Sequence, residues 1–135
     1  MIVSHIITDI EKVLENPEAQ EFDIAFASYA EDDSGSIKVD QVEAYHWNEE
    51  DEEFFLVPSG AANLYELDPV ELKAGEFLKQ LKDIKNDKIL SYEAFARARI
   101  KKLEDGRIAS LNSPLWGTGI HHDAKLIYFY HGKRP

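Results

Sequence analysis

The stretch FDIAFASYA (22–30), followed by the turn EDDSGS (31–36) and then by IKVDQVEAYHW (37–47), decides the fold. Residues 22–30 are apolar at both parities and rich in strand formers, which is typical of a strand covered on both faces. The run 37–47 alternates less regularly, so we expect it to be the partner strand, at a sheet edge with one half-wet face. The chain is therefore built around a β-hairpin.

The segments on either side of this hairpin extend the pattern. Residues 4–15 predict a helix, because apolar side chains recur there at spacings of three and four. Pro17 disfavours helical backbone at Asn16 and helps to end that helix. FFLVP (54–58) predicts a short third strand that its proline ends or confines to an edge.

A second helix signal lies near residue 70. Asp68 is the expected N-cap, Pro69 occupies the first helical position, and Glu71 completes a capping box. The apolar positions from Val70 to Ile84 then form the stripe that we expect to be buried.

The rest of the chain reads as strands. Residues 92–102 and 108–112 predict a hairpin with a tight turn around Asp105-Gly106. LWGTG (115–119) reads as a glycine turn that leads into a last strand, HDAKLIYFYH (122–131), placed in the sheet interior.

These elements give the order α-β-β-β-α-β-β-β. We expect a single α+β domain over residues 1–135, with a largely antiparallel sheet of about six strands and two helices packed on one face. The two halves, 1–60 and 61–135, have the same element order, which raises a weak internal repeat as an open hypothesis.

Charge is divided unevenly along the chain. Residues 1–60 carry 16 acidic and 2 basic side chains, and residues 61–135 carry 10 acidic and 13 basic ones, for a total of −11. An acidic surface repels phosphate backbones and complements a basic protein, so we expect no nucleic-acid partner. The absence of cysteine, of a secretory leader and of a long apolar run predicts a soluble, cytoplasmic protein that does not enter a membrane.

The segment LWGTGIHHDAK (115–125) is the most enzyme-like stretch. In a strand His121 and Asp123 share a face, and the carboxylate could fix the tautomer of the imidazole for acid/base work, with His46 or Tyr128 nearby. His131 lies too far along such a strand to join them. Neither the spacing of a zinc site nor any nucleotide-binding motif occurs, so we predict no metal site and no cofactor.

Two charged groups are candidates for binding. Arg97, Arg99 and Lys101 share one face of their strand and could hold an anionic ligand or pair with the acidic half. Aromatic side chains flank a run of five acids that could steer and anchor a basic partner. The residues assigned to this partner-binding cluster are Trp47, Glu49, Glu50, Asp51, Glu52 and Glu53.

Three functions stay open from the sequence. The first is a non-enzymatic module that docks on a basic protein, as inhibitor-like or immunity-like proteins do. The second is a small-molecule-binding protein, or a hydrolase or isomerase that uses the His121–Asp123 pair between sheet and helices. The third is a structural homodimer that forms through an exposed strand edge.

Overall fold

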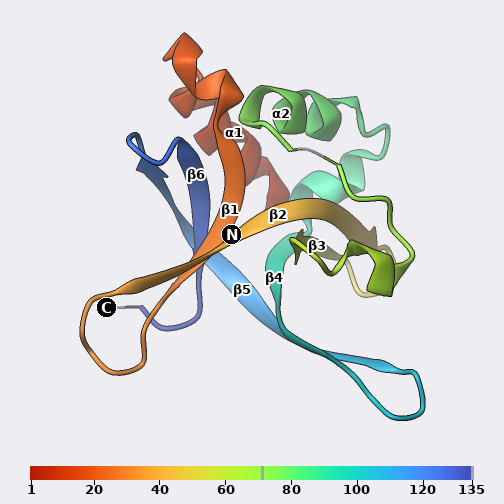
Figure 1. Cartoon of the computed structure of the whole chain (residues 1–135). Helices are drawn as coiled ribbons and strands as arrows, with labels where there is room; N and C mark the ends of the chain where they lie inside the picture. Colours follow the sequence, from red (N-terminus) through yellow and green to blue (C-terminus); the bar gives the residue numbers. More distant parts are fainter. Residues whose placement is uncertain (71, 135) are drawn as a thin grey trace.

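The computed structural model describes residues 1–70 and 72–134 and has an α+β fold (Figure 1). Two α-helices pack on a sheet of six strands, as the sequence predicts, but the sheet is mixed, with two parallel pairings. The elements are α1 (Val3–Val13), β1 (Asp23–Tyr29), β2 (Ile37–Asn48), β3 (Glu53–Pro58), α2 (Ala74–Asp83), β4 (Glu93–Lys102), β5 (Ile108–His121) and β6 (Leu126–His131). Three 3-10 turns join them, η1 (Pro17–Glu21), η2 (Ala62–Tyr65) and η3 (Asp87–Ser91).

The sheet closes on itself. Its order is β1-β2-β3-β4-β5-β6, and a parallel pairing of β1 with β6 completes a barrel. β3 and β4 are also parallel, and the other neighbours are antiparallel. The edge position predicted for 37–47 is therefore wrong, because β2 pairs with β1 through its first half and with β3 through its second.

The two halves of the barrel repeat one pairing register. The pair Ala25↔Gln41 between β1 and β2 has its counterpart in Phe95↔Pro114 between β4 and β5. The β2–β3 register shifts between Val42 and Ala44, and the β5–β6 register shifts at the equivalent place, between Leu115 and Gly117. Equivalent positions of the two halves can therefore be compared residue by residue.

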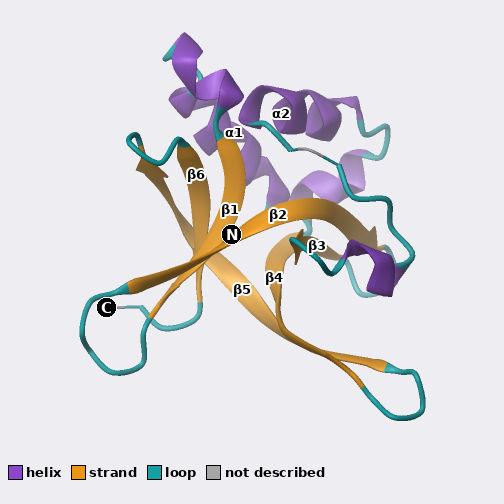
Figure 2. Ribbon diagram, viewed as in Figure 1, coloured by secondary structure: helices purple, strands orange, loops and turns teal. Residues whose placement is uncertain are grey.

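Both helices lie on the same side of the strands (Figure 2). α1 buries Val3, Ile6 and Ile10, and α2 buries Ala74, Phe77 and Leu81 with the same spacing. Each of the larger side chains among these contributes roughly 1.5–3 kcal/mol when it leaves water, and Ala74 contributes less. The main core thus lies between helices and barrel, and the loops of the β1–β2 and β4–β5 hairpins extend away from it (Figure 1). No helix in residues 1–70 and 72–134 is long and apolar enough to span a membrane.

The start of the second helix was predicted wrongly. α2 begins at Ala74, and Asp68 is not its N-cap; Glu71 lies outside the described residues. Val70 and Leu72 are held by the sheet instead: Val70 N donates to Glu43 O at 2.8 Å, and Leu72 O accepts from Ile24 N at 3.3 Å. These tertiary hydrogen bonds override the local capping signal.

The glycines of 115–119 are not in a turn either. They belong to β5, which runs to His121, and the turn comes later, at 122–125. A Cβ on Gly119 would lie 2.5 Å from Cε2 of Tyr128 on the neighbouring strand. Glycine is needed there to make room for a cross-strand aromatic ring.

Candidate functional site

A cavity of about 780 Å³ opens at the barrel end away from the helices. It lies between the β1–β2 and β4–β5 hairpins and is closed at its sides by the last residues of β3 and β6. Ligand sites in proteins commonly have volumes of about 300–1,000 Å³ and often occupy the mouths of barrels. This end of the barrel is therefore the first place to look for function.

One wall of the cavity is polar. His131, the last residue of β6, is only 7% exposed, and its ring packs edge-on against Phe26 with centroids 5.2 Å apart. The Nδ1 atom of this imidazole is buried and has no hydrogen-bond partner in the described chain. Ser113, Ser28 and Asp40 line the same cavity, and Ser113 is itself buried. Buried polar atoms are nearly always satisfied, so the free Nδ1 calls for an explanation.

Burial favours the neutral form of the His131 imidazole. Burial lowers the pKa of His131 below its ordinary value, Lys38 lowers it further, and the carboxylate of Asp40 acts in the opposite direction. A neutral imidazole has one N–H donor and one nitrogen acceptor. The polar wall therefore presents donors and acceptors without a net charge on the histidine.

A second part of the lining, which we call the apolar wall, consists of apolar side chains. It is formed by residues after β3 and on the β4–β5 hairpin, namely Pro58, Ala61, Leu64, Ala98, Ile100 and Leu111. Leu111 is 51% exposed, although its side chain is large and hydrophobic. The cavity thus has two faces of different chemistry.

Of the three predicted anion-binding residues, Arg97 packs on an aromatic surface. Its guanidinium lies 3.6 Å from the ring centroid of Phe55 and 4.9 Å from that of Tyr65. Arg97 Nη1 donates to Asn112 Oδ1 at 2.9 Å, and Nε donates to His46 Nε2 at 3.4 Å. Burial and the nearby Arg97 charge lower the pKa of His46 to about 4, so this histidine is a neutral acceptor.

Arg97 and Arg99 both line the barrel-end cavity, and Lys101 does not. The β4–β5 register shifts between Ala98 and Lys101, and Arg99 has a φ of 49°, so the predicted alternation of faces stops there. Arg99 is exposed and pairs with Glu31 at 3.2 Å across the cavity mouth, and Lys101 is also exposed. The bulge changes the direction of the side chains that follow Ala98 and leaves Lys101 outside the cavity.

The structure does not assemble the predicted His121–Asp123–His46 group. His121 Nδ1 accepts a hydrogen bond from Ala124 N at 2.9 Å, and both His121 and Asp123 are exposed at a turn. His46 instead contacts Phe55, Tyr65 and Arg97. Neither His121 nor Asp123 lines the barrel-end cavity.

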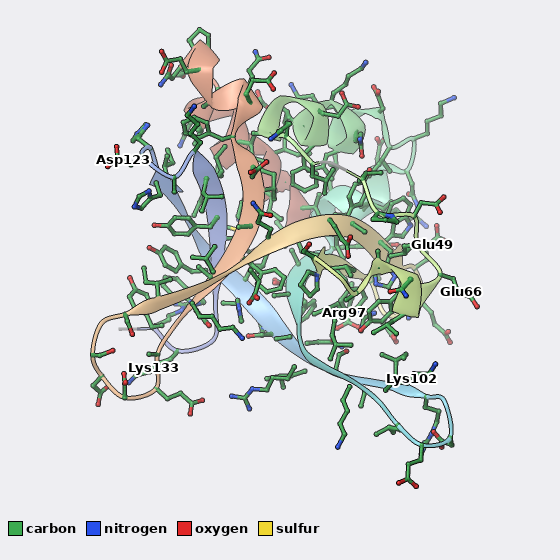
Figure 3. All side chains as sticks on the ribbon, in the orientation of Figure 1. Glu49, Glu66, Arg97, Lys102, Asp123 and Lys133 are labelled. Carbon is green, nitrogen blue, oxygen red and sulfur yellow. The ribbon has the colours of Figure 1, made fainter. Side chains whose placement is uncertain are left out.

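The acidic cluster forms the tight turn between β2 and β3. Asn48 Oδ1 accepts from the backbone N–H groups of Glu50 and Asp51, and the turn residues Glu49 to Glu52 are exposed while Glu53 is partly buried. The flanking aromatics do not point outward as expected of anchors. Phe54 is buried in the main core, and Trp47 packs against that core. Figure 3 shows Glu49 and Asp123 on opposite sides of the molecule.

Sequence reasoning missed His131, Ser113 and Asp40 as site residues. The alternation of side chains along β6 could have indicated His131. Ile127 and Phe129 are fully buried on that strand, and His131 lies on the same face. A histidine at the inward position of a strand end is the kind of group that lines a barrel mouth.

In residues 1–70 and 72–134, no group of three or more His, Asp or Glu side chains is placed to hold a metal ion. Comparison with protein-family models, with curated proteins and with solved structures finds no match for this chain. Function is therefore argued from the geometry of the cavity.

Proposed function

We propose that this chain is a small-ligand-binding protein and that the barrel-end cavity is its binding site. The observation that carries the proposal is the buried imidazole of His131, whose Nδ1 has no partner in the described chain and which lines the cavity. An unsatisfied buried polar atom costs about 1–3 kcal/mol. Protein atoms cover Nδ1, so a ligand in the cavity supplies this hydrogen bond only if the His131 ring or its neighbours shift.

The arrangement supports binding in preference to catalysis. A nucleophilic site needs a hydroxyl within hydrogen-bond reach of a base that a third group orients. In the described chain no hydrogen bond joins His131 to Ser28, Ser113 or Asp40. The proposed role of these groups is to recognise a ligand.

A paired set of variants tests the proposal. Ala98 lines the cavity, whereas Ala109 lies on the same hairpin, is exposed and does not line it. Ala98→Leu fills the apolar wall, and Ala109→Leu adds the same side chain elsewhere. In a thermal-shift screen against a library of small molecules, the wild type and Ala109→Leu should share stabilising compounds that Ala98→Leu no longer binds. A library with no stabilising compound, or hits that Ala98→Leu keeps, would contradict the proposal.

A second candidate function is docking on a basic protein, expected from the charge of residues 1–60. The observation that favours it is the β2–β3 turn, where Asn48 holds a run of exposed carboxylates in a fixed loop. Such charge raises association rates more than affinity. The turn should bind a basic protein with a strong salt dependence, and the variant with residues 49–53 neutralised should lose most of its association rate while its unfolding midpoint stays unchanged. Equal association rates would exclude the turn.

Two further expectations remain proposals. We infer a cytoplasmic protein without a nucleic-acid partner from its lack of cysteine and its net charge. A homodimer would need a surface other than a strand edge, because the closed barrel leaves none of its six described strands without neighbours.

A further inference from the structure

We propose that the ligand of the barrel-end cavity is an uncharged amphipathic small molecule whose polar edge carries both a hydrogen-bond donor and an acceptor. This inference rests on the proposed function, because it names the ligand class of the same cavity.

Two of the cations around the cavity form ion pairs within the protein. Arg99 pairs with Glu31 at 3.2 Å, and Lys133, shown in Figure 3 beside the β1–β2 loop, pairs with Asp33. Lys38 and Asp40 carry opposite charges two residues apart on β2, and both line the cavity. Apart from Arg97, the positive and negative charges of these residues therefore offset one another.

The remaining cation of the lining, Arg97, is also engaged. Its guanidinium is stacked over Phe55 and donates to Asn112 Oδ1 at 2.9 Å. An anion that bound Arg97 would have to use the N–H groups that these contacts leave free. This makes an anionic headgroup a poor match to the lining.

The groups with unused hydrogen-bonding capacity are uncharged. They are the imidazole of His131 and the hydroxyls of Ser113 and Ser28, none of which donates or accepts a side-chain hydrogen bond in the described chain. Imidazole and hydroxyl groups both donate and accept, so their complement is a group that also does both, such as an amide or a heterocycle edge. Burying an ionised group beside them would cost several kcal/mol without a countercharge.

The apolar wall accounts for the rest of the ligand. Ala98, Ile100 and Leu111 face the cavity, and Leu111 is 51% exposed. An apolar body lying on this wall would remove Leu111 from water while the polar edge reached His131. The two walls thus require one molecule with two chemically different sides.

Three compounds with one phenyl ring and different headgroups test the ligand class. Benzamide is uncharged, benzoate is an anion and benzylamine is a cation at neutral pH. Each is titrated into the isotope-labelled full chain, and binding is followed by NMR shifts of the imidazole nitrogens of His131 and of the Ser113 amide. We expect benzamide to bind at least about tenfold more tightly than either ion, which is the worth of one well-made hydrogen bond. His131→Phe, which keeps a ring but removes both nitrogens, should abolish this preference.

The outcomes distinguish a wrong ligand class from a wrong binding site. Equal or tighter binding of benzoate or benzylamine overturns the ligand class but leaves the cavity as the site. If none of the three compounds binds, the compounds found in the library screen test the ligand class instead. An uncharged library compound that binds at His131 supports the proposed ligand class, and a charged one overturns it. If no compound of either set binds at the cavity, both the ligand class and the proposed function are wrong. Should His131→Phe fail to fold, the imidazole shifts of the wild type still give the result.

Discussion

Asn48 and His121 accept the same hydrogen bond at equivalent positions of the two half-barrels. Asn48 Oδ1 accepts from Asp51 N at 3.2 Å, and His121 Nδ1 accepts from Ala124 N at 2.9 Å, three residues later in each case. Asn48 pairs with Glu53 across the β2–β3 hairpin, and His121 pairs with Leu126 across the β5–β6 hairpin. Both turns also hold a residue with positive φ, Glu52 at 55° and Lys125 at 55°. His121 is thus a turn residue, and this role accounts for it without catalysis.

A pair of substitutions at His121 tests this role. His121→Asn should keep the stability of the wild type, because the amide oxygen can accept the same bond that Asn48 accepts. His121→Ala should lose about 0.5–1.5 kcal/mol, the net value of one hydrogen bond. Urea unfolding measures both. If the two variants are equally destabilised, the turn hydrogen bond is not what His121 contributes.

Two glycines of β5 differ in the space beside them. The Cβ of Gly119→Ala would lie 2.5 Å from Tyr128 Cε2, whereas that of Gly117→Ala would lie 3.7 Å from Tyr130 Cδ2, an ordinary contact. We expect Gly119→Ala to cost about 1–3 kcal/mol of unfolding free energy through overpacking, and Gly117→Ala to be near neutral. Thermal or urea unfolding of the two variants is the measurement, and removing the ring with Tyr128→Leu should rescue the first. A neutral Gly119→Ala would mean that Tyr128 moves aside freely.

Stability should fall in mild acid because of His46. Its pKa is lowered to about 4 from an ordinary value of 6.5, so as the pH falls the unfolded chain takes up the proton first. The contribution of neutral His46 is therefore full above pH 6.5 and is lost as the pH falls toward 4. The whole shift would be worth roughly 3 kcal/mol, but the ring is only half-buried and we expect about 1–2 kcal/mol.

Urea unfolding at about pH 7.5 and about pH 5 measures this loss. The variant His46→Gln should flatten the dependence on pH, whereas His121→Gln, at an exposed turn, should keep it. An identical loss in wild type and His46→Gln would assign the acid sensitivity to other groups, among them the buried His131, whose pKa is lowered in the same direction.

We expect lysine at position 97 to stabilise the fold less than arginine does. Arg97 stacks on Phe55 and donates to Asn112 and His46 with one planar group, which a lysine ammonium cannot reproduce. Arg97→Lys should cost about 1 kcal/mol of unfolding free energy. The matched control is Arg99→Lys, whose side chain is exposed and should change stability by less than about 0.5 kcal/mol. Equal effects at the two positions would show that the stacked geometry has no special value.

Local patterns predict the elements whose geometry is set within a few residues. The helix of 4–15, the strands at 22–30, 37–47 and 54–58 and the turn around Gly106 all appear close to their predicted bounds. The start of α2 and the path of 115–121 depend instead on contacts with distant strands, and there the local signals of Asp68 and Gly117 misled. Closure of the barrel requires two parallel pairings between distant segments, which no local pattern contains.

The candidate site depends on the same long-range arrangement. His131 and His121 lie at opposite ends of the β5–β6 ladder, where His131 pairs with Leu115 and His121 with Leu126. The sequence separates the two histidines correctly but cannot show that the end of the barrel with His131 is the one that opens into a cavity. Whether the two halves arose by duplication stays a hypothesis. A duplication would produce the same register in the β2–β3 and β5–β6 hairpins, as is seen here.

The most direct test of the account is to find where a bound small molecule touches the chain. Backbone amide shifts of the isotope-labelled protein are mapped while a compound from the library screen is titrated. The account predicts the largest changes at Ser28, Ser113 and His131, with the turn at 49–53 unaffected. Changes confined to that turn, or to α1 and α2, would contradict the assignment of the barrel-end cavity as the binding site.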